Sequence, residues 1–169
     1  MEIPPAFKPL TTYIRRAEEL DKDVCNSNAS VVAYHCRMYA IDKGMKLGLP
    51  QSECEFLFKI MGVIEKSPHT SLSKDIGKTT CEDFALHVFH IADDEDRGAA
   101  GATMGTAKTF YSASAYFDIL EQFGELEPDV SSMLILYIPS TIVIIFVYIF
   151  ILLYRSAKSA NILSGKQQI

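Results

Sequence analysis

The sequence predicts an all-α fold made of tandem antiparallel helical bundles. Apolar residues recur at intervals of three and four along most of residues 10–123, which is the spacing of one face of an α-helix. No stretch alternates apolar and polar residues between turn signals, so no strand is predicted. A loop of polar and helix-breaking residues at 68–79 separates three helices from two more.

The first predicted bundle covers residues 1–67 and contains three helices. The apolar face of its first helix consists of Leu10, Tyr13, Ala17 and Leu20. The main apolar face of its second helix consists of Val31, Tyr34, Met38, Ile41 and Met45. A second apolar flank of that helix consists of Val32, Cys36 and Tyr39. Two flanks indicate that the second helix lies between two neighbours, and Gly48 and Pro50 end it.

The third helix is predicted to begin at a capping box, Ser52-x-x-Glu55, in which the two side chains satisfy backbone N–H groups of the first turn. Its apolar face consists of Cys54, Leu57, Met61 and Ile64. The spacing of this face matches that of the two preceding helices. Three amphipathic helices of this kind can bury their apolar faces against one another.

The second predicted bundle covers residues 80–127 and has two helices. Thr80 and Asp83 open the fourth helix, and an acidic turn is predicted at 92–98. The apolar face of the fourth helix consists of Cys81, Phe84, Val88 and Ile91. The fifth helix is predicted over 99–123, with a face formed by Phe110, Ala113, Phe117, Leu120 and Phe123. No soluble third helix follows, so this bundle is either incomplete or completed by an apolar C-terminal helix.

An apolar segment at 131–154 follows the predicted bundles. Residues 133–154 carry no charge over about 22 residues, which is enough to span a bilayer as a helix. A buried core helix is the alternative, but no other predicted helix is apolar enough to cover it on all sides. With a basic polar tail at 155–169 and no signal peptide pattern at the N-terminus, the sequence predicts a tail-anchored topology.

The charge of the chain excludes one class of partner and favours another. Three of the 16 basic residues follow Asp129, so residues 1–129 hold 13 basic and 21 acidic residues, a net charge of −8. Such a surface repels a phosphate backbone, so no nucleic acid partner is expected, and basic peptides suit it better. The four cysteines form no CxxC pair, which disfavours a zinc ribbon or disulfide scaffold and favours reduced thiols in the cytosol.

One pattern raises the alternative of a metal-dependent helical enzyme. Asp83, His87, His90 and Asp94 share one helical face. A metal site in a bundle also needs ligands from a facing helix, and the fifth helix offers only acidic residues near its far end. These four residues are therefore expected to face solvent, and neither a metal nor another cofactor is predicted. No nucleophile or phosphate-binding motif occurs, so the chain is not predicted to be an enzyme.

Three separated blocks of the sequence resemble a known family. They are VVAYHCRMYAIDKGMK at 31–46, FALHVFHIADDEDR at 84–97 and TAKTFYSASAYFDILEQFGEL at 106–126. They closely resemble the N-terminal domain of the Vta-type vacuolar protein sorting family, the cofactors of the AAA ATPase that disassembles ESCRT-III polymers. The resemblance implies two tandem MIT-like three-helix bundles that bind C-terminal helices of ESCRT-III subunits.

The resemblance ends near residue 127, where the apolar segment takes over. The family's polar third helix of the second bundle, its linker and its C-terminal module, which contacts the ATPase, have no match here. The resemblance thus implies an adaptor in multivesicular body sorting on the cytosolic face of endosomes, without the direct ATPase-contacting part. The alternative is a small tail-anchored membrane protein whose helical domain binds an unrelated peptide.

Recognition of a partner helix would take place in a groove between the second and third helices. The predicted apolar walls of this groove are Met38, Ile41, Met45, Leu57, Ile60 and Ile64. The predicted acidic rim is Asp42, Glu53 and Glu65. Periodicity alone does not separate groove residues from core residues, so many of the apolar candidates are equally compatible with the core.

Overall fold

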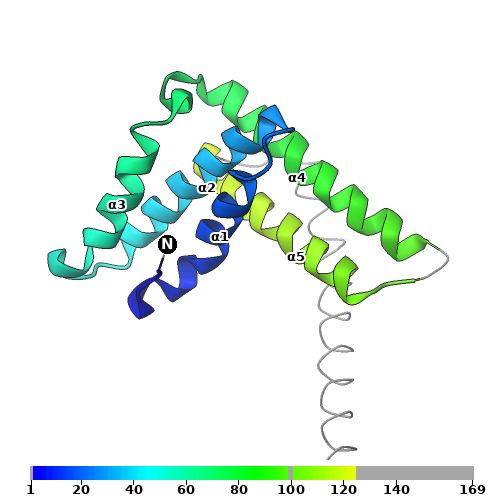
Figure 1. The fold of residues 1–169 in the computed structure, drawn as a ribbon, viewed down its shortest axis with the longest axis horizontal. Helices are drawn as coiled ribbons and strands as arrows, with labels where there is room; N and C mark the ends of the chain where they lie inside the picture. Colours follow the sequence, from blue (N-terminus) through cyan, green and yellow to red (C-terminus); the bar gives the residue numbers. More distant parts are fainter. Residues whose placement is uncertain (1, 99–100, 125–169) are drawn as a thin grey trace, which may run out of the picture. The chain divides into compact units, whose positions relative to one another are not determined.

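A computed structural model describes residues 2–98 and 101–124, and within these ranges the chain is all-α with no strand. The α-helices are α1 (Thr11–Leu20), α2 (Ser27–Lys46), α3 (Glu55–Ile64), α4 (Lys74–Arg97) and α5 (Met104–Asp118) (Figure 1). Short 3-10 helices are η1 (Pro5–Leu10), η2 (Gln51–Glu53), η3 (Pro68–Ser71) and η4 (Ile119–Phe123). The predicted all-α class is confirmed.

The predicted apolar segment at 131–154 and the tail at 155–169 lie outside the described residues. In the part of the chain that the structure describes, no helix combines the length and the apolar character needed to cross a bilayer.

The core of the first three helices forms where η1, α1, α2 and α3 meet. It consists of Phe7, Leu10, Ile14, Ala40, Phe56, Leu57, Ile60 and Ile64. The rings of Phe7 and Phe56 pack with their centroids 5.3 Å apart, which joins η1 to α3. Gly44 of α2 allows the close approach: a Cβ placed there would lie 2.7 Å from a methyl carbon of Leu57 and 3.0 Å from one of Leu10.

The buried face of α2 differs from the predicted main face. The residues expected to form only a flank, Val32, Cys36 and Tyr39, are 0%, 1% and 4% exposed. The small residues Ala29, Ala33, Ala40 and Gly44 are buried beside them. Because α2 contacts α1, α3 and α4, a face of small residues lets several helices approach closely. Small residues contribute little to an apolar pattern, so the pattern pointed to the wrong face.

Helices α4 and α5 lie side by side and pack through aromatic rings (Figure 1). The Phe89 ring lies 5.6 Å from the Phe110 ring and 6.3 Å from the Phe117 ring, and Phe84 meets Tyr116 edge to face at 5.1 Å. Such edge-to-face pairs add to the burial of apolar area. The buried apolar face of α4 is Cys81, Ala85, Phe89 and Ala92. It is rotated from the predicted face, and Ile91 is 40% exposed.

Two helix starts were predicted wrongly. Helix α3 begins at Glu55 with Cys54 in the N-cap position, two residues after the predicted N-cap at Ser52. Helix α4 begins at Lys74 rather than Thr80, because Ser73 caps it by accepting a hydrogen bond from the Ile76 N–H at 3.3 Å. Before α4, more than one serine or threonine could have served as a cap.

The predicted acidic turn and the start of the fifth helix also differ. Residues 93–96 continue α4, and Asp93 is buried and paired with Arg97 at 3.0 Å one turn later. This i, i+4 pair stabilises the helix through the acidic run. Helix α5 begins at Met104, later than the predicted start at 99, because Thr103 and Thr106 form a capping box there.

Polar contacts join α1 and α2 to α5 and η4. The Tyr13 hydroxyl donates to Asp118 at 2.9 Å, and the Tyr39 hydroxyl donates to Glu121 at 3.0 Å. The Lys43 ammonium donates to the same Glu121 at 2.8 Å and holds the pKa of that carboxyl below its usual range. Together with the packing of α2 on α4, these contacts make the described residues up to 124 one compact unit. The division into bundles at 1–67 and 80–127 stays a prediction.

His35 is the buried side chain at the meeting point of α2, α4 and η4. Its Nδ1 lies 3.4 Å from the Gln122 amide oxygen, and its ring packs 4.9 Å from the Phe123 ring and 5.1 Å from the Tyr34 ring. A Cβ added at Gly77 would lie 2.5 Å from its Nε2. Burial lowers the pKa of His35 from its ordinary value of 6.5. Burial therefore favours the neutral imidazole in this contact between helices.

We predict that Gly77→Ala lowers the free energy of unfolding by about 1–3 kcal/mol, because the new methyl group would overlap the His35 ring. Gly62→Ala is the matched control: it lies inside α3 with nothing within 4 Å of the added Cβ. It should raise the free energy of unfolding by about 0.5–1 kcal/mol through helix propensity. Urea unfolding of both variants checks this, and equal effects of the two would contradict the packing described.

We also predict that His35 makes the protein less stable at acidic pH. Because burial lowers its folded-state pKa, the unfolded chain binds more protons below pH 6.5, and the free energy of unfolding falls as the pH drops from about 7 to about 5. The measurement is the midpoint of urea unfolding across this range for the protein and for His35→Gln. The variant should lose part of the decline, and identical pH profiles would contradict the prediction.

Candidate peptide-binding surface

The outward face of α2 carries half-exposed apolar residues. Met38 is 39% and Met45 57% exposed, and Ile41 between them is partly buried against the core of the first three helices. Asp42 lies on the same face and pairs with Lys46 at 2.6 Å. An exposed pair of this kind adds little to stability, because water screens it. The four predicted site residues of α2 therefore share one accessible face.

The predicted site residues of α3 do not share this accessibility. Leu57, Ile60 and Ile64 are 0%, 2% and 7% exposed and belong to the core. In their place, α3 exposes Phe58 (51%) and Met61 (38%). These three branched residues are buried because they face η1, α1 and α2. The helical spacing of apolar residues shows which of them share a face, but it does not show which helices pack against that face.

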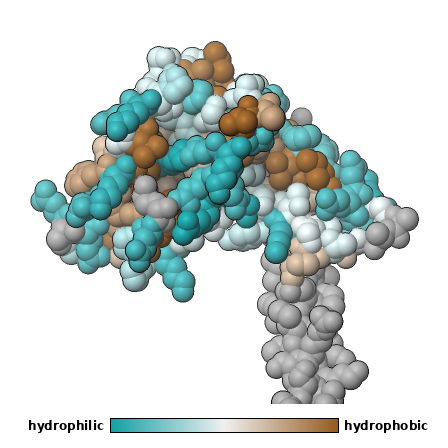
Figure 2. All heavy atoms as spheres, viewed as in Figure 1, coloured by the Kyte–Doolittle hydropathy of each residue, from teal (hydrophilic) through white to brown (hydrophobic). Residues whose placement is uncertain are grey.

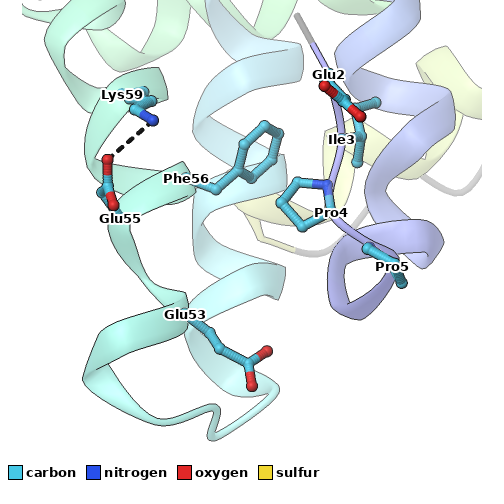
Figure 3. Close-up of a pocket in the computed structure, with 8 residues that line it drawn as sticks. All are labelled: Glu2, Ile3, Pro4, Pro5, Glu53, Glu55, Phe56 and Lys59. Atoms are coloured by element: carbon cyan, nitrogen blue, oxygen red, sulfur yellow. Dashed lines mark ion pairs between the residues drawn. The ribbon is translucent and has the colours of Figure 1, made fainter.

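The predicted acidic rim is divided between two places. Glu65 is exposed at the C-terminal end of α3, where its N–H donates to the Met61 carbonyl at 2.9 Å. Glu53 instead lies at η2, where it lines a hollow together with residues 2–5 of the N-terminal segment (Figure 3). Of the three predicted rim residues, Asp42 and Glu65 therefore lie on α2 and at the end of α3, and Glu53 does not.

Two further hollows adjoin Tyr34 of α2. One, of about 360 Å³, reaches Ile64 and His69. The other, of about 260 Å³, is lined by Met38 together with Leu72 and Phe123. Leu72 was not predicted to lie at this surface, because it belongs to the loop before α4 and to no helical repeat of apolar residues. Phe123 was assigned to a helix face and instead lies at the edge of this hollow.

The surface of the described residues combines hydrophobic and hydrophilic side chains. On the face that Figure 2 presents, hydrophobic residues lie in small separate patches, and hydrophilic residues fill the space between them. The large apolar side chains that are more than one third exposed on α2 and α3 are Met38, Met45, Phe58, Met61 and Val63. Methionine and phenylalanine supply deformable and flat contact area, which suits binding of an apolar peptide face.

The residues considered for catalysis or metal binding do not form such a site. Asp83, His87, His90 and Asp94 are exposed on α4, and no group of three His, Cys, Asp or Glu side chains within 2–98 and 101–124 is arranged to hold a metal ion. Burial raises the pKa of the Cys36 thiol to about 12, so this thiol stays protonated and packs as a core residue.

The chain is similar to known proteins over most of its described length. A family model described as Vta1 like matches residues 9–137. The Arabidopsis thaliana protein named homolog of mammalian LYST-interacting protein 5 is 41% identical over 128 residues. Vacuolar protein sorting-associated protein VTA1 homologs are 37% identical over 131 residues in Bos taurus and 34% identical over 136 residues in Dictyostelium discoideum.

These alignments cover most of this chain and less than half of each relative. They take in 73%, 73% and 76% of this chain, against 28%, 41% and 24% of the Arabidopsis, Bos and Dictyostelium proteins. The chain therefore spans between about a quarter and two fifths of the length of these relatives. The family match over residues 9–137 includes α1 to α5.

We predict opposite results for two Asp substitutions on neighbouring helices. Leu57→Asp places a carboxylate in the core and should abolish the cooperative thermal transition. Met45→Asp changes an exposed side chain and should alter the free energy of unfolding by no more than about 0.5 kcal/mol. Circular dichroism during heating checks both. A folded Leu57→Asp protein would contradict the assignment of Leu57 to the core.

Proposed function

The chain belongs to the Vta1-like family, and on that basis we propose that it acts in vacuolar and endosomal sorting as a non-enzymatic adaptor. The observation that carries this proposal is the family match over residues 9–137, which covers α1 to α5. The relatives named as vacuolar protein sorting-associated proteins support the pathway. Our proposed site of action is the cytosolic face of endosomal membranes.

The partners in this proposal are C-terminal helices of ESCRT-III subunits. Their docking surface is the groove between α2 and α3, two helices that contact each other. Met38 and Met45 on α2, with Phe58 and Met61 on α3, offer the exposed apolar area. An amphipathic helix would place its apolar residues on these side chains, as in other helix-in-groove complexes.

Charge favours the same kind of partner. Residues 1–129 carry a net charge of −8, which attracts a basic helix and speeds its association. Asp42 and Glu65 are exposed carboxylates on α2 and at the end of α3. Lys46 pairs with Asp42 in the structure, so a basic partner residue would compete with that pair. The proposal extends to the AAA ATPase of the ESCRT pathway as a partner of the assembled complex.

The proposal is tested by titrating the full chain with synthetic C-terminal helices of ESCRT-III subunits. We predict a Kd in the micromolar range, about −8 kcal/mol. Met38→Asp should weaken binding by about tenfold or more, because it places a carboxylate among apolar contacts. Ile91→Asp is the matched control, since Ile91 is 40% exposed on α4 against 39% for Met38 on α2.

The two variants separate a binding effect from a general one. Retained affinity in Ile91→Asp together with weak binding by Met38→Asp supports the α2–α3 groove. Equal affinities of the two variants would remove Met38 from the site. No binding of any ESCRT-III helix by the folded full chain would contradict the proposed partner class, and circular dichroism confirms that each variant is folded.

A further inference from the structure

The hollow that Glu53 lines lies between the N-terminal segment and α3. We name it the N-terminal hollow; it has a volume of about 600 Å³. Its lining residues are Glu2, Ile3, Pro4, Pro5, Glu53, Glu55, Phe56 and Lys59 (Figure 3). Volumes of about 300–1,000 Å³ are typical of sites that bury a ligand group.

The walls of the N-terminal hollow are held in place by the core. Phe56 points from α3 toward Pro4 (Figure 3), and its ring packs against the Phe7 ring with centroids 5.3 Å apart. Ile3 packs against the core of the first three helices, and the Phe7 N–H donates to the Pro4 carbonyl at 2.9 Å. Proline rings at positions 4 and 5 restrict the backbone of this wall. A ligand would therefore enter a preformed apolar slot.

The rim of the N-terminal hollow is acidic. It carries three glutamates and one lysine, and that lysine, Lys59, pairs with Glu55 at 2.9 Å. Glu2 and Glu53 form no ion pair with any other residue that the structure describes. Two carboxylates beside an apolar floor attract a cation that is joined to an apolar group, and they repel anionic ligands.

We propose that the N-terminal hollow binds a basic peptide, which inserts one large apolar side chain against Phe56 and places Lys or Arg residues beside Glu2 and Glu53. A peptide fits this combination because it carries an apolar anchor and cations on both sides of it. This site shares no lining residue with the exposed apolar face of α2. It therefore adds a second peptide-binding surface that does not depend on the groove of the proposed function.

The probe is the peptide Lys-Lys-Phe-Lys-Lys. It is too short to form a stable helix, so it is not expected to bind in a groove that recognises helices. Its binding to the full chain is followed by saturation-transfer NMR on the phenyl protons. Lys-Lys-Ser-Lys-Lys tests the need for the apolar anchor, and Glu-Glu-Phe-Glu-Glu tests the need for positive charge. Each should bind at least about tenfold more weakly than the probe.

Three double variants locate the binding. Glu2→Lys with Glu53→Lys should weaken probe binding about tenfold or more. Asp83→Lys with Asp94→Lys makes the same change in net charge at exposed positions of α4 and should leave the affinity within about twofold. Met38→Asp with Met45→Asp disturbs the proposed groove for ESCRT-III helices and should not weaken probe binding.

Several results would overturn the proposal. Equal losses in the two charge-reversal variants would show attraction to net charge only. A loss confined to the Met38 and Met45 variant would place the peptide in the groove of the proposed function. Equal binding of the acidic peptide, or no binding of the probe, would reject a basic ligand. Self-association of the full chain in sedimentation velocity that Glu2→Lys with Glu53→Lys abolishes would assign the hollow to a second copy instead.

Discussion

Helix α2 must pack against three other helices at once, and the rest of the described structure depends on how it does so. Its inward face presents Ala33, Cys36, Ala40 and Gly44, so α1, α3 and α4 can all approach its backbone closely. The contact at Gly44 shows how tight this is, because methyl groups of Leu57 and Leu10 fill the place that a side chain would take. Interiors packed to this density tolerate little added volume.

This constraint decides which residues remain for binding. Since the inward face of α2 holds small residues, its larger methionines at 38 and 45 remain outside. Helix α3 shows the reverse arrangement: its branched residues Leu57 and Ile60 fill the core beside α2, and Phe58 and Met61 are left on the surface. The exposed apolar area of both helices therefore follows from the core and is not separate from it.

The acidic character of the chain acts together with these surfaces. The two binding sites that we propose each combine apolar side chains with carboxylates: Asp42 and Glu65 for the groove between α2 and α3, and Glu2 and Glu53 for the N-terminal hollow. In both proposals a negative surface attracts a basic peptide. We propose a helix as the ligand of the groove, and a short basic segment with a single apolar anchor as the ligand of the hollow.

The sequence by itself determined the all-α class, the order of the five α-helices, and the family, because helical periodicity and residue identity are local properties. It also placed Met38, Ile41 and Met45 on one face of α2. Only the tertiary structure decided that Leu57 is core and that Glu53 faces the N-terminal segment. The physical reason is that burial depends on which helices become neighbours. Small residues such as Gly44 decide those contacts while adding almost nothing to the hydrophobic pattern.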